Sequence, residues 1–296
     1  MSTRALDQYT RAAALAANQV IACYSTSFGA ATRLLGPRHR QHIRNIYALV
    51  RVADEIVDGV AEEARLSTEQ QSQALERFVA ETHRAVGTGF SSDLVIHAFA
   101  TTARLAGIDA SLVDPFFASM RADLVNASRP GPTRFDAAAH DEYVHGSAEV
   151  VGLMCLRVFI RDEHPAGDEL RVLEHGASQL GAAFQEVNFL RDLADDTARL
   201  DRSYLGTGER ISTADRDACL ARIRGQIADA EATLPLLPRD ARAAVRSAAA
   251  LFSALADRIA VTDVDQLYRQ RVRVPDAAKA AIIARAVART WQERPR

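Results

Sequence analysis

Residues that favour helices fill almost the whole chain, and this feature most restricts the folds open to it. Alanine, leucine, arginine, glutamate and glutamine dominate the sequence, and all five have high helix propensity. Few segments alternate apolar and polar residues with a period of two, so little of the chain is suited to a sheet. Expected helix starts include the capping patterns at Ser67 and Asp93. We therefore expect an all-α fold, with residues 1–296 forming a single domain.

Charge and composition exclude several classes of protein. The chain has 38 acidic and 36 basic side chains, so it lacks the basic excess of a non-specific nucleic-acid binder, and we expect no nucleic-acid partner. Its longest apolar run, residues 150–156, is too short to span a membrane. Cys23, Cys155 and Cys219 are far apart and form no CxxC pair, which favours a reduced, cytoplasmic compartment. His39 and His42 lie among basic residues, and we expect both to be solvated.

A first polar stripe runs along the segment from residue 47 to residue 58. Tyr47, Arg51, Asp54 and Asp58 are spaced by four, three and four residues, so they share one face of a helix. Most of the other positions in this segment are apolar, and a helix that is apolar almost all round is usually buried. Because unpaired buried carboxylates are costly, the stripe is expected to face a cavity or a partner.

A second polar stripe lies in the segment from residue 185 to residue 196. Asn188, Asp192 and Asp196 follow one another at intervals of four, with Gln185 one turn earlier and Arg191 beside them. A single Asp-x-x-x-Asp pair, taken alone, favours a solvated helix surface. Two such stripes, each with an arginine and each set in an apolar helix, are much harder to explain in that way.

The composition of the stripes predicts what they bind. Like charges four residues apart destabilise a helix by roughly 0.2–0.5 kcal/mol, so the aspartates need a cation. Carboxylate and amide oxygens without histidine or cysteine favour Mg²⁺, with Mn²⁺ as an alternative. Magnesium that is bound by only a few carboxylates completes its coordination shell with water and phosphate oxygens. Two stripes facing each other across a helical cavity therefore predict a diphosphate site, to which Arg51 and Arg191 add bidentate contacts.

These motifs resemble those of the squalene/phytoene synthase family, the head-to-head trans-isoprenyl diphosphate synthases. Asp54 to Asp58 is similar to the first aspartate-rich motif of the family, and Asn188 to Asp196 is similar to the second. The other similar segments are 24–28, 143–152, 202–205, Tyr268, and 271–274. Within the family, these motifs are most similar to those of bacterial phytoene synthases. The resemblance implies an isoprenoid-synthase-type helical bundle around a central cavity.

Three positions depart from the family pattern. Glu149 stands where the family often has glycine, and Gly206 stands where it often has proline. Glu55 replaces an aspartate in the first motif, at a position that the spacing places off the stripe. The first two changes leave the acceptor and the product open, and none of the three removes a predicted metal ligand.

The resemblance implies a Mg²⁺-dependent condensation of two geranylgeranyl diphosphates to phytoene, a step of carotenoid biosynthesis. The first diphosphate leaves with its charge stabilised by the metal and arginine, and the second molecule attacks the allylic cation. A cyclopropylcarbinyl diphosphate forms, ionises and rearranges. We expect no nicotinamide cofactor and no covalent enzyme intermediate.

The resemblance and the stripes together assign roles to individual residues. The predicted metal ligands are Asp54, Asp58, Asn188, Asp192 and Asp196. The four aspartates are also assigned to catalysis, together with Arg51 and Tyr143. The predicted substrate-binding residues are Ser25, Ser27, Phe28, Tyr47, Gln185, Arg191, Tyr204 and Tyr268. For Tyr143, Tyr204 and Tyr268, a half-buried ring that only packs is an equal alternative, and residues 150–156 fit either a plain core or a tunnel wall.

Other functions remain open on the same residues. Squalene-type synthesis from farnesyl diphosphate is one, and it requires hydride from a nicotinamide cofactor or from partner enzymes. Prenyl transfer to an aromatic acceptor is another. A non-catalytic scaffold is a third, although two complete acidic stripes argue against it. We expect a cytoplasmic protein that contacts membrane surfaces transiently, because its substrates are lipids, and the sequence leaves the oligomeric state open.

Overall fold

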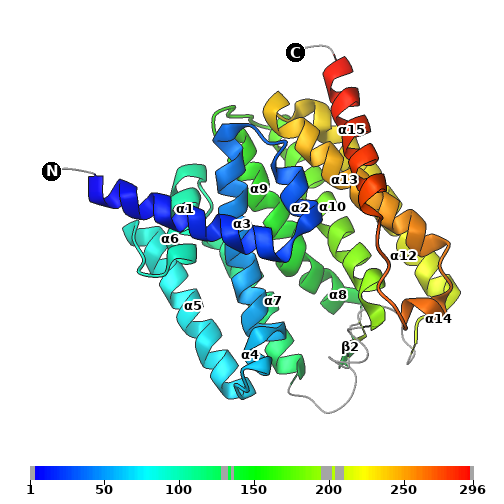
Figure 1. Ribbon diagram of the computed structural model, residues 1–296, viewed down its shortest axis with the longest axis horizontal. Helices are drawn as coiled ribbons and strands as arrows, with labels where there is room; N and C mark the ends of the chain where they lie inside the picture. Colours follow the sequence, from blue (N-terminus) through cyan, green and yellow to red (C-terminus); the bar gives the residue numbers. More distant parts are fainter. Residues whose placement is uncertain (1–3, 128–132, 135–136, 195–201, 204–209, 294–296) are drawn as a thin grey trace.

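The computed structural model describes residues 4–127, 133–134, 137–194, 202–203 and 210–293, and these ranges form a bundle of helices (Figure 1). The first part comprises α1 (Arg4–Tyr24), α2 (Thr26–Thr32), α3 (Pro37–Asp58), α4 (Val60–Glu63), α5 (Thr68–Thr88), α6 (Leu94–Ala106) and α7 (Ala110–Ala127). The middle comprises α8 (Ala137–Val144), the π-helical turn η1 (His145–Glu149), α9 (Val150–Ile160) and α10 (Asp168–Arg191). The last part comprises α12 (Thr213–Thr233), the 3₁₀ turn η2 (Leu234–Leu236), α13 (Arg239–Ala260), α14 (Val264–Leu267) and α15 (Asp276–Gln292).

The expected all-α class is confirmed. Within the described ranges the only sheet is a parallel pair of two-residue strands, β1 (Thr133–Arg134) and β2 (Arg202–Ser203). Helix ends follow the capping residues. Ser67 accepts from the backbone N–H of Gln70, whose side chain bonds back to Ser67, and this capping box starts α5. Asp93 accepts from two backbone N–H groups in the first turn of α6.

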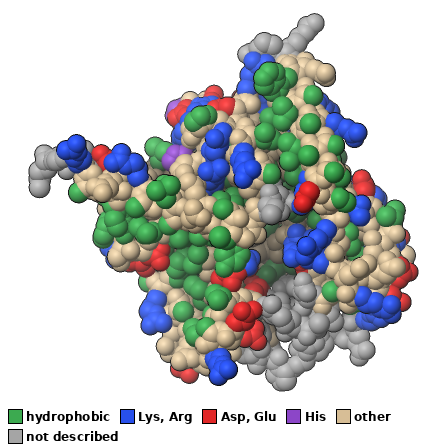
Figure 2. Space-filling view, in the orientation of Figure 1, with side chains coloured by type: hydrophobic (Ala, Val, Ile, Leu, Met, Phe, Trp, Pro, Cys, Tyr) green, Lys and Arg blue, Asp and Glu red, His purple; other side chains and the backbone are tan. Residues whose placement is uncertain are grey.

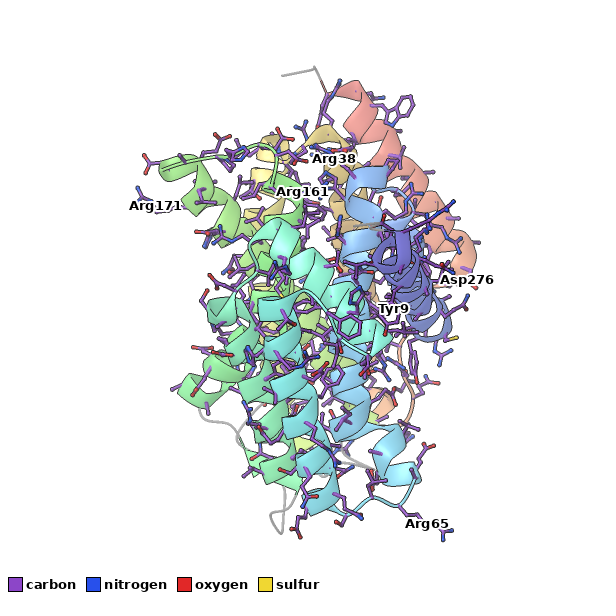
Figure 3. All side chains as sticks on the ribbon, turned by 90° about the vertical axis from the view of Figure 1, so that its left-hand side faces the viewer. Tyr9, Arg38, Arg65, Arg161, Arg171 and Asp276 are labelled. Atoms are coloured by element: carbon purple, nitrogen blue, oxygen red, sulfur yellow. The ribbon has the colours of Figure 1, made fainter. Side chains whose placement is uncertain are left out.

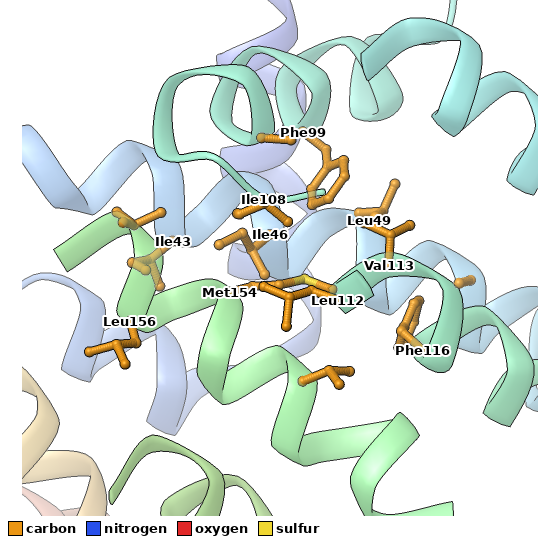
Figure 4. Packing of buried hydrophobic residues seen from close by; sticks show 14 of the residues in the cluster. Ile43, Ile46, Leu49, Phe99, Ile108, Leu112, Val113, Phe116, Met154 and Leu156 are labelled. Carbon is orange, nitrogen blue, oxygen red and sulfur yellow. The ribbon is translucent and has the colours of Figure 1, made fainter. Parts of the chain in front are cut away.

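Two apolar clusters hold the bundle together. The first lies between α3, α5, α6, α7 and α9 (Figure 4), and its most buried members include Ile46, Leu49, Phe99, Phe116 and Met154. The second lies between α10, α12 and α13, with Val187, Leu190, Leu220, Ile223 and Ile259 at its centre. α9 belongs to the first cluster and most of α10 to the second, so the boundary between the clusters runs along this helix pair.

Glycines allow α9 and α10 to approach closely. A Cβ atom on Gly152 would lie 2.4 Å from the carbonyl oxygen of Ala177, and one on Gly181 would lie 2.5 Å from that of Ala148. Residue 152 therefore packs on 177 and residue 148 on 181, which makes the two helices antiparallel. Any larger residue at either position would push the helices apart.

One helical stretch among the described residues, Ala138–Ile160, is long and apolar enough to cross a membrane by length and composition. It runs from α8 through η1 into α9, and 56% of its most apolar 18-residue window is buried inside the bundle. This burial is the behaviour of a core helix, so the stretch is weak evidence for a membrane span.

His39 and His42 are not solvated, so that prediction is wrong. His39 is completely buried, and its Nε2 lies 3.1 Å from Oδ1 of Asp240 at the start of α13. Nδ1 of His42 lies 2.9 Å from the hydroxyl of Thr102 on α6. Both partners are distant in sequence, so local composition did not reveal them. Arg38 lies at the same end of the molecule, opposite the end where Arg65 follows α4 (Figure 3).

Candidate active site

An apolar cavity of about 230 Å³ lies between α2, α3, α9, α10, α12 and α13. The α10 side chains that line it recur every three or four residues from Leu173 to Gln185, which corresponds to about 18 Å along the helix. η1 and α9 line it from Ser147 to Phe159 in the opposite direction. The cavity is therefore elongated. We call the end at Val50, Ser147 and Gln185 the mouth, and the end at Phe159, Leu173 and Leu237 the floor.

Residues 150–156 serve both functions that the sequence left open. Val151, Gly152, Cys155 and Leu156 line the cavity. Val150 and Met154 are buried in the first cluster instead. Burial also raises the pKa of the Cys155 thiol to about 12, so that thiol is neutral and behaves as an apolar wall.

The first polar stripe begins where α3 leaves the cavity. Nη1 of Arg51 donates to Oδ2 of Asp54 at 2.5 Å, and Nη2 of Arg51 donates to Glu55. The guanidinium also lies 4.5 Å from the ring centroid of Tyr24. Burial disfavours the charge on Arg51, but the two carboxylates outweigh it, so the pKa of Arg51 is raised.

Glu55 belongs to this cluster although the spacing placed it off the stripe. Its Oε1 binds Arg51 and its Oε2 accepts the backbone N–H of Val60 at 3.0 Å, which starts α4. A Cβ atom on Gly59 would lie 2.3 Å from Oε2 of Glu55, so a larger residue at position 59 would displace this carboxylate. The change from aspartate to glutamate therefore lengthens a side chain that shapes the end of α3.

The N-terminal segment and Tyr47 meet at the cavity. The rings of Phe28 and Tyr47 are stacked with centroids 5.5 Å apart, and Phe28 also lines the cavity. Ser25 caps α2 by accepting the backbone N–H of Phe28 at 3.1 Å, and its side chain hydrogen-bonds Tyr47. Burial raises the pKa of Tyr47. Ser27 belongs to α2, and its side chain lies outside the described part of the structure.

The second stripe is not one straight helix, which corrects the sequence prediction. α10 ends at Arg191, and the backbone of Asp192 has φ −99° and ψ 9°. At this helix end, Arg191 binds Asp192 through two contacts of 2.8 and 2.5 Å. Asp196 lies outside the described residues.

A second arginine also binds Asp192. Nε of Arg271 lies 2.7 Å from Oδ1 of Asp192, although the two residues are 79 positions apart. Tyr268 helps to hold the segment that carries Arg271, because its hydroxyl accepts the backbone N–H of Ile211 at 2.9 Å. The sequence analysis placed Arg271 only in the family-like segment 271–274 and assigned it no role.

The residues at the mouth fit a hard cation by their chemistry. Oδ1 of Asn188 is buried and accepts no hydrogen bond from any described residue, so it is an oxygen ligand without a partner. Asp54 and Asp58 on α3, and Asp192 directly after α10, supply carboxylates, a donor set that suits Mg²⁺. Within the described ranges, no three His, Cys, Asp or Glu side chains form a ready metal cluster. The metal assignment therefore stays a prediction.

Other predicted residues lie away from the cavity lining. Tyr143 is buried, and its hydroxyl donates to the buried carboxylate of Asp123 at 3.0 Å. Glu149 pairs with Nδ1 of His145 at 2.9 Å on the same helix. Tyr204 lies outside the described residues, as does Gly206.

Ser147 is a lining residue that the sequence did not single out. Its hydroxyl is buried at the mouth and has no hydrogen-bond partner among the described residues. It lies in the π-helical turn η1, a kind of distortion that often occurs at functional sites. Nothing in the residue spacing predicts a π turn, so the sequence contains no signal that could have identified Ser147.

The surface around the mouth carries both signs of charge. Figure 2 shows this face hollowed, with basic side chains on one side of the hollow and acidic side chains on another. Arg51, Arg191 and Arg271 are 32%, 21% and 41% exposed, so each remains accessible from solvent. The arrangement is an apolar cavity with a charged and accessible mouth, which suits an amphipathic anion with a long apolar tail.

Comparison with known proteins gives consistent matches. The squalene/phytoene synthase family profile matches residues 21–209. A phytoene synthase of Pseudescherichia vulneris is 31% identical over 229 residues, which covers 72% of this chain and 69% of that protein. A 15-cis-phytoene synthase of Synechocystis is 28% identical, with 88% and 80% covered. A solved dehydrosqualene synthase structure has a TM-score of 0.77 at 19% identity over 97% of this chain and 99% of that chain, which confirms the predicted fold.

Proposed function

The chain belongs to the squalene/phytoene synthase family, and from this we propose that it joins two geranylgeranyl diphosphates head to head to form phytoene. One observation carries the proposal: an elongated apolar cavity has accessible arginine–carboxylate pairs at its mouth, Arg51 with Asp54 and Arg271 with Asp192. The similarity to phytoene synthases favours the longer substrate over farnesyl diphosphate. The apolar walls favour prenyl chains, because each buried methylene contributes about 0.8 kcal/mol to binding.

The arginines of the mouth bind the diphosphate in this proposal. Arg51 and Arg191 each pair with a carboxylate on the same helix or next to it, and both pairs are partly exposed. Exposed pairs contribute little to stability, so an incoming diphosphate can replace the carboxylate as the partner. Arg271 adds a third guanidinium, and guanidinium groups bind phosphate oxygens in a bidentate geometry.

The metal site lies next to these arginines. Asp54, Asp58, Asn188 and Asp192, with Asp196 from outside the described residues, would hold Mg²⁺, which supplies Lewis-acid stabilisation of the leaving diphosphate. When the carboxylates bind a cation, their arginines become free to bind the anionic substrate. The aspartates and the arginines therefore act as one exchangeable set of charges.

The cavity walls protect the reacting carbon chains. Val151, Leu156 and Leu180 expose only hydrocarbon to the cavity, so little water is available to capture an allylic cation. The second prenyl chain then supplies the nucleophile. Gln185 and Ser147 are the polar side chains at the mouth end of the lining, beside the position proposed for the diphosphate.

We place this activity in the cytoplasm, with transient contact between the protein and a membrane surface that supplies the substrates. Cys23, Cys155 and Cys219 are free thiols, which agrees with a reducing compartment. No nicotinamide cofactor takes part in the proposed reaction, since its product forms by proton loss without added hydride.

The test compares substrates directly. Purified protein with Mg²⁺ should convert geranylgeranyl diphosphate to a C40 hydrocarbon and release diphosphate, with or without NADPH. Product analysis by chromatography and mass spectrometry identifies the chain length. Consumption of farnesyl diphosphate alone would contradict the substrate assignment, and a requirement for NADPH would favour squalene-type synthesis.

A further inference from the structure

Three arginines gather where α2 ends and α3 begins, apart from the aspartates of the mouth. Arg33 directly follows α2, and Arg40 and Arg44 are neighbours one turn apart on α3. Nε and Nη2 of Arg40 donate to the carbonyl oxygen of Leu35 at 3.2 and 2.8 Å, so Arg40 reaches back over the turn that follows Arg33. Figure 2 shows basic side chains at this junction of α2 and α3, on the same face as the hollow. We call Arg33, Arg40 and Arg44 the arginine cluster.

The arginine cluster has no carboxylate partner within the part of the chain that the structure describes. Arg38 on the same helix binds three carboxylates, whereas Nη1 of Arg44 donates to the amide oxygen of Asn18 at 3.2 Å. Nε of Arg44 is buried and has no hydrogen-bond partner among the described residues. Burial is the main cause that lowers the pKa of Arg44, and the charges of Arg40 and Arg33 add to it. Three guanidinium groups with unused donors are complementary to the oxygens of a phosphate group.

We infer that the arginine cluster binds the phosphate group of an anionic membrane lipid and turns this face of the protein toward the bilayer. The inference rests on the proposed function, in which a membrane surface supplies the substrates, and it names the residues that contact that surface. It involves none of the residues assigned to the diphosphate or to the metal.

An exposed leucine lies beside the cluster on α1. Leu15 is 64% exposed, and it is one helical turn from Asn18, the residue that Arg44 contacts. An aliphatic side chain next to arginines suits the boundary between lipid headgroups and acyl chains. A free phosphate ion offers nothing for this leucine to contact, so the surroundings favour a lipid phosphate.

An exposed tryptophan lies on the other side of the cluster, near the end of α15. Trp291 is 81% exposed. The end of α15 is held near the α2–α3 junction through the start of α13: the backbone N–H of Gly36 donates to the carbonyl oxygen of Asp240 at 2.7 Å, and Nη2 of Arg239 donates to that of Glu293 at 3.4 Å. Figure 3 shows α1 and α15 along the same edge of the molecule. Tryptophan is a common residue on surfaces that lie in a membrane interface.

The inner side of the same corner lines the apolar cavity. Ala31, Thr32 and Leu35, on either side of Arg33 in the sequence, are lining residues. A bilayer held at the arginine cluster therefore lies about one helix diameter, roughly 10 Å, from the cavity wall. This placement gives a prenyl chain a short path between the lipid and the cavity.

The experiment measures sedimentation of the intact protein with vesicles of phosphatidylcholine, alone or mixed with phosphatidylglycerol. The native protein should bind the mixed vesicles more tightly, and added salt should weaken this binding. Arg33→Gln combined with Arg44→Gln should weaken it about 25-fold, since each basic residue at an anionic surface contributes about fivefold. The matched control is Arg65→Gln combined with Arg77→Gln, which removes the same charge at exposed positions outside the cluster and should bind as the native protein does.

A single charge reversal covers the case in which the double variant does not fold. Arg33 is exposed, so Arg33→Glu should fold and should also weaken binding to mixed vesicles about 25-fold. Native affinity for mixed vesicles in either folded variant overturns the inference, as does equal binding of the native protein to both kinds of vesicle. Titration with inorganic phosphate distinguishes the source of the anion: phosphate binding that depends on the cluster, without vesicle binding, also overturns it.

Activity on detergent-dissolved geranylgeranyl diphosphate separates this inference from the proposed function. The cluster variants should keep native activity there, because detergent replaces the bilayer as the source of substrate. A native protein that binds mixed vesicles through the cluster but does not convert this substrate would contradict the proposed function alone.

Discussion

The mouth and the floor of the cavity both contain arginine–carboxylate pairs, but the pairs differ in what they join. At the mouth, Arg51 binds Asp54 three residues away and Arg191 binds its neighbour Asp192, and only Arg271 reaches Asp192 from a distant segment. At the floor, Arg242 binds Glu293, 51 residues away. Pairs within one helix can break without separating any two elements. Pairs between elements hold the bundle together.

The two ends also differ in burial. The Arg51 and Asp54 side chains are 32% and 35% exposed, whereas Arg242 is 6% exposed. Breaking an exposed pair costs little, because water replaces the lost partner. Breaking a buried pair leaves an uncompensated charge, at about 3–5 kcal/mol. The same chemistry therefore gives weakly held, exposed pairs at one end, as the proposed diphosphate site requires, and a structural anchor at the other.

The largest expected effect is the loss of activity when a mouth carboxylate is neutralised. Asp192→Asn should lower kcat by about 10³-fold, since a charge acting on the leaving group is worth roughly that factor. Helicity and Tm should change little, because Asp192 lies at an accessible helix end. Steady-state assays and circular dichroism measure the two quantities.

The control for Asp192→Asn is Asp217→Asn. Asp217 also pairs with the arginine next to it, Arg216 at 2.8 Å, but it lies on α12 and does not line the cavity. This control should keep full activity. An Asp192→Asn variant with native kcat would mean that the mouth is not the catalytic centre.

The second prediction concerns the floor, where a substitution should lower stability and leave activity nearly unchanged. Arg242→Met should lower the free energy of unfolding by about 3 kcal/mol, because two backbone carbonyls lose a buried donor and Glu293 keeps only Arg246 of its two buried arginine partners. Activity per folded molecule should stay near native at low temperature. Arg224→Met, which removes a half-exposed partner of Asp257, should be close to neutral in a thermal or urea unfolding experiment. Equal losses in the two variants would remove the contrast between buried and exposed pairs.

Arg271 allows substrate binding at the mouth to be separated from the chemical step. Arg271→Gln should raise KM about tenfold and change kcat less, because Arg191 still binds Asp192 and the lost contact is a partly exposed one to diphosphate. Arg269→Gln makes the same charge change at an exposed position on the same segment and should leave KM unchanged. A drop in kcat with a constant KM would instead place Arg271 in the chemical step.

The contrast also explains what the sequence was able to predict. Helix propensity and capping are local, so the all-α class and the starts of α5 and α6 were correct. Each acidic motif lies within one helix or at its end, and residue spacing brought Tyr47, Arg51 and Asp54 together. The contact between Asp192 at the end of α10 and Arg271 was missed because Arg271 comes from a distant segment. The grouping of residues at the floor could not be predicted for the same reason, since these residues meet only in the folded bundle.

The smallest prediction concerns His42, whose environment at the floor end depends on folding. Burial is the main reason that its pKa is lowered to about 4, and the charges of Arg161 and His39 add to the effect. The unfolded chain has the ordinary pKa of about 6.5, so below that pH the unfolded state binds more protons than the folded state. Stability should therefore fall as the pH drops from about 6.5 towards 4.

Between pH 7 and pH 5 this loss should amount to about 1 kcal/mol after allowance for solvent screening, or a decrease in Tm of about 2 °C. His42→Gln keeps a hydrogen-bonding group near Thr102 but cannot be protonated, so its Tm should fall less over the same range. His175→Gln, at a position 59% exposed, should follow the native curve. An identical pH dependence in all three proteins would show that His42 does not couple protonation to folding, and that the acid sensitivity of the bundle arises elsewhere.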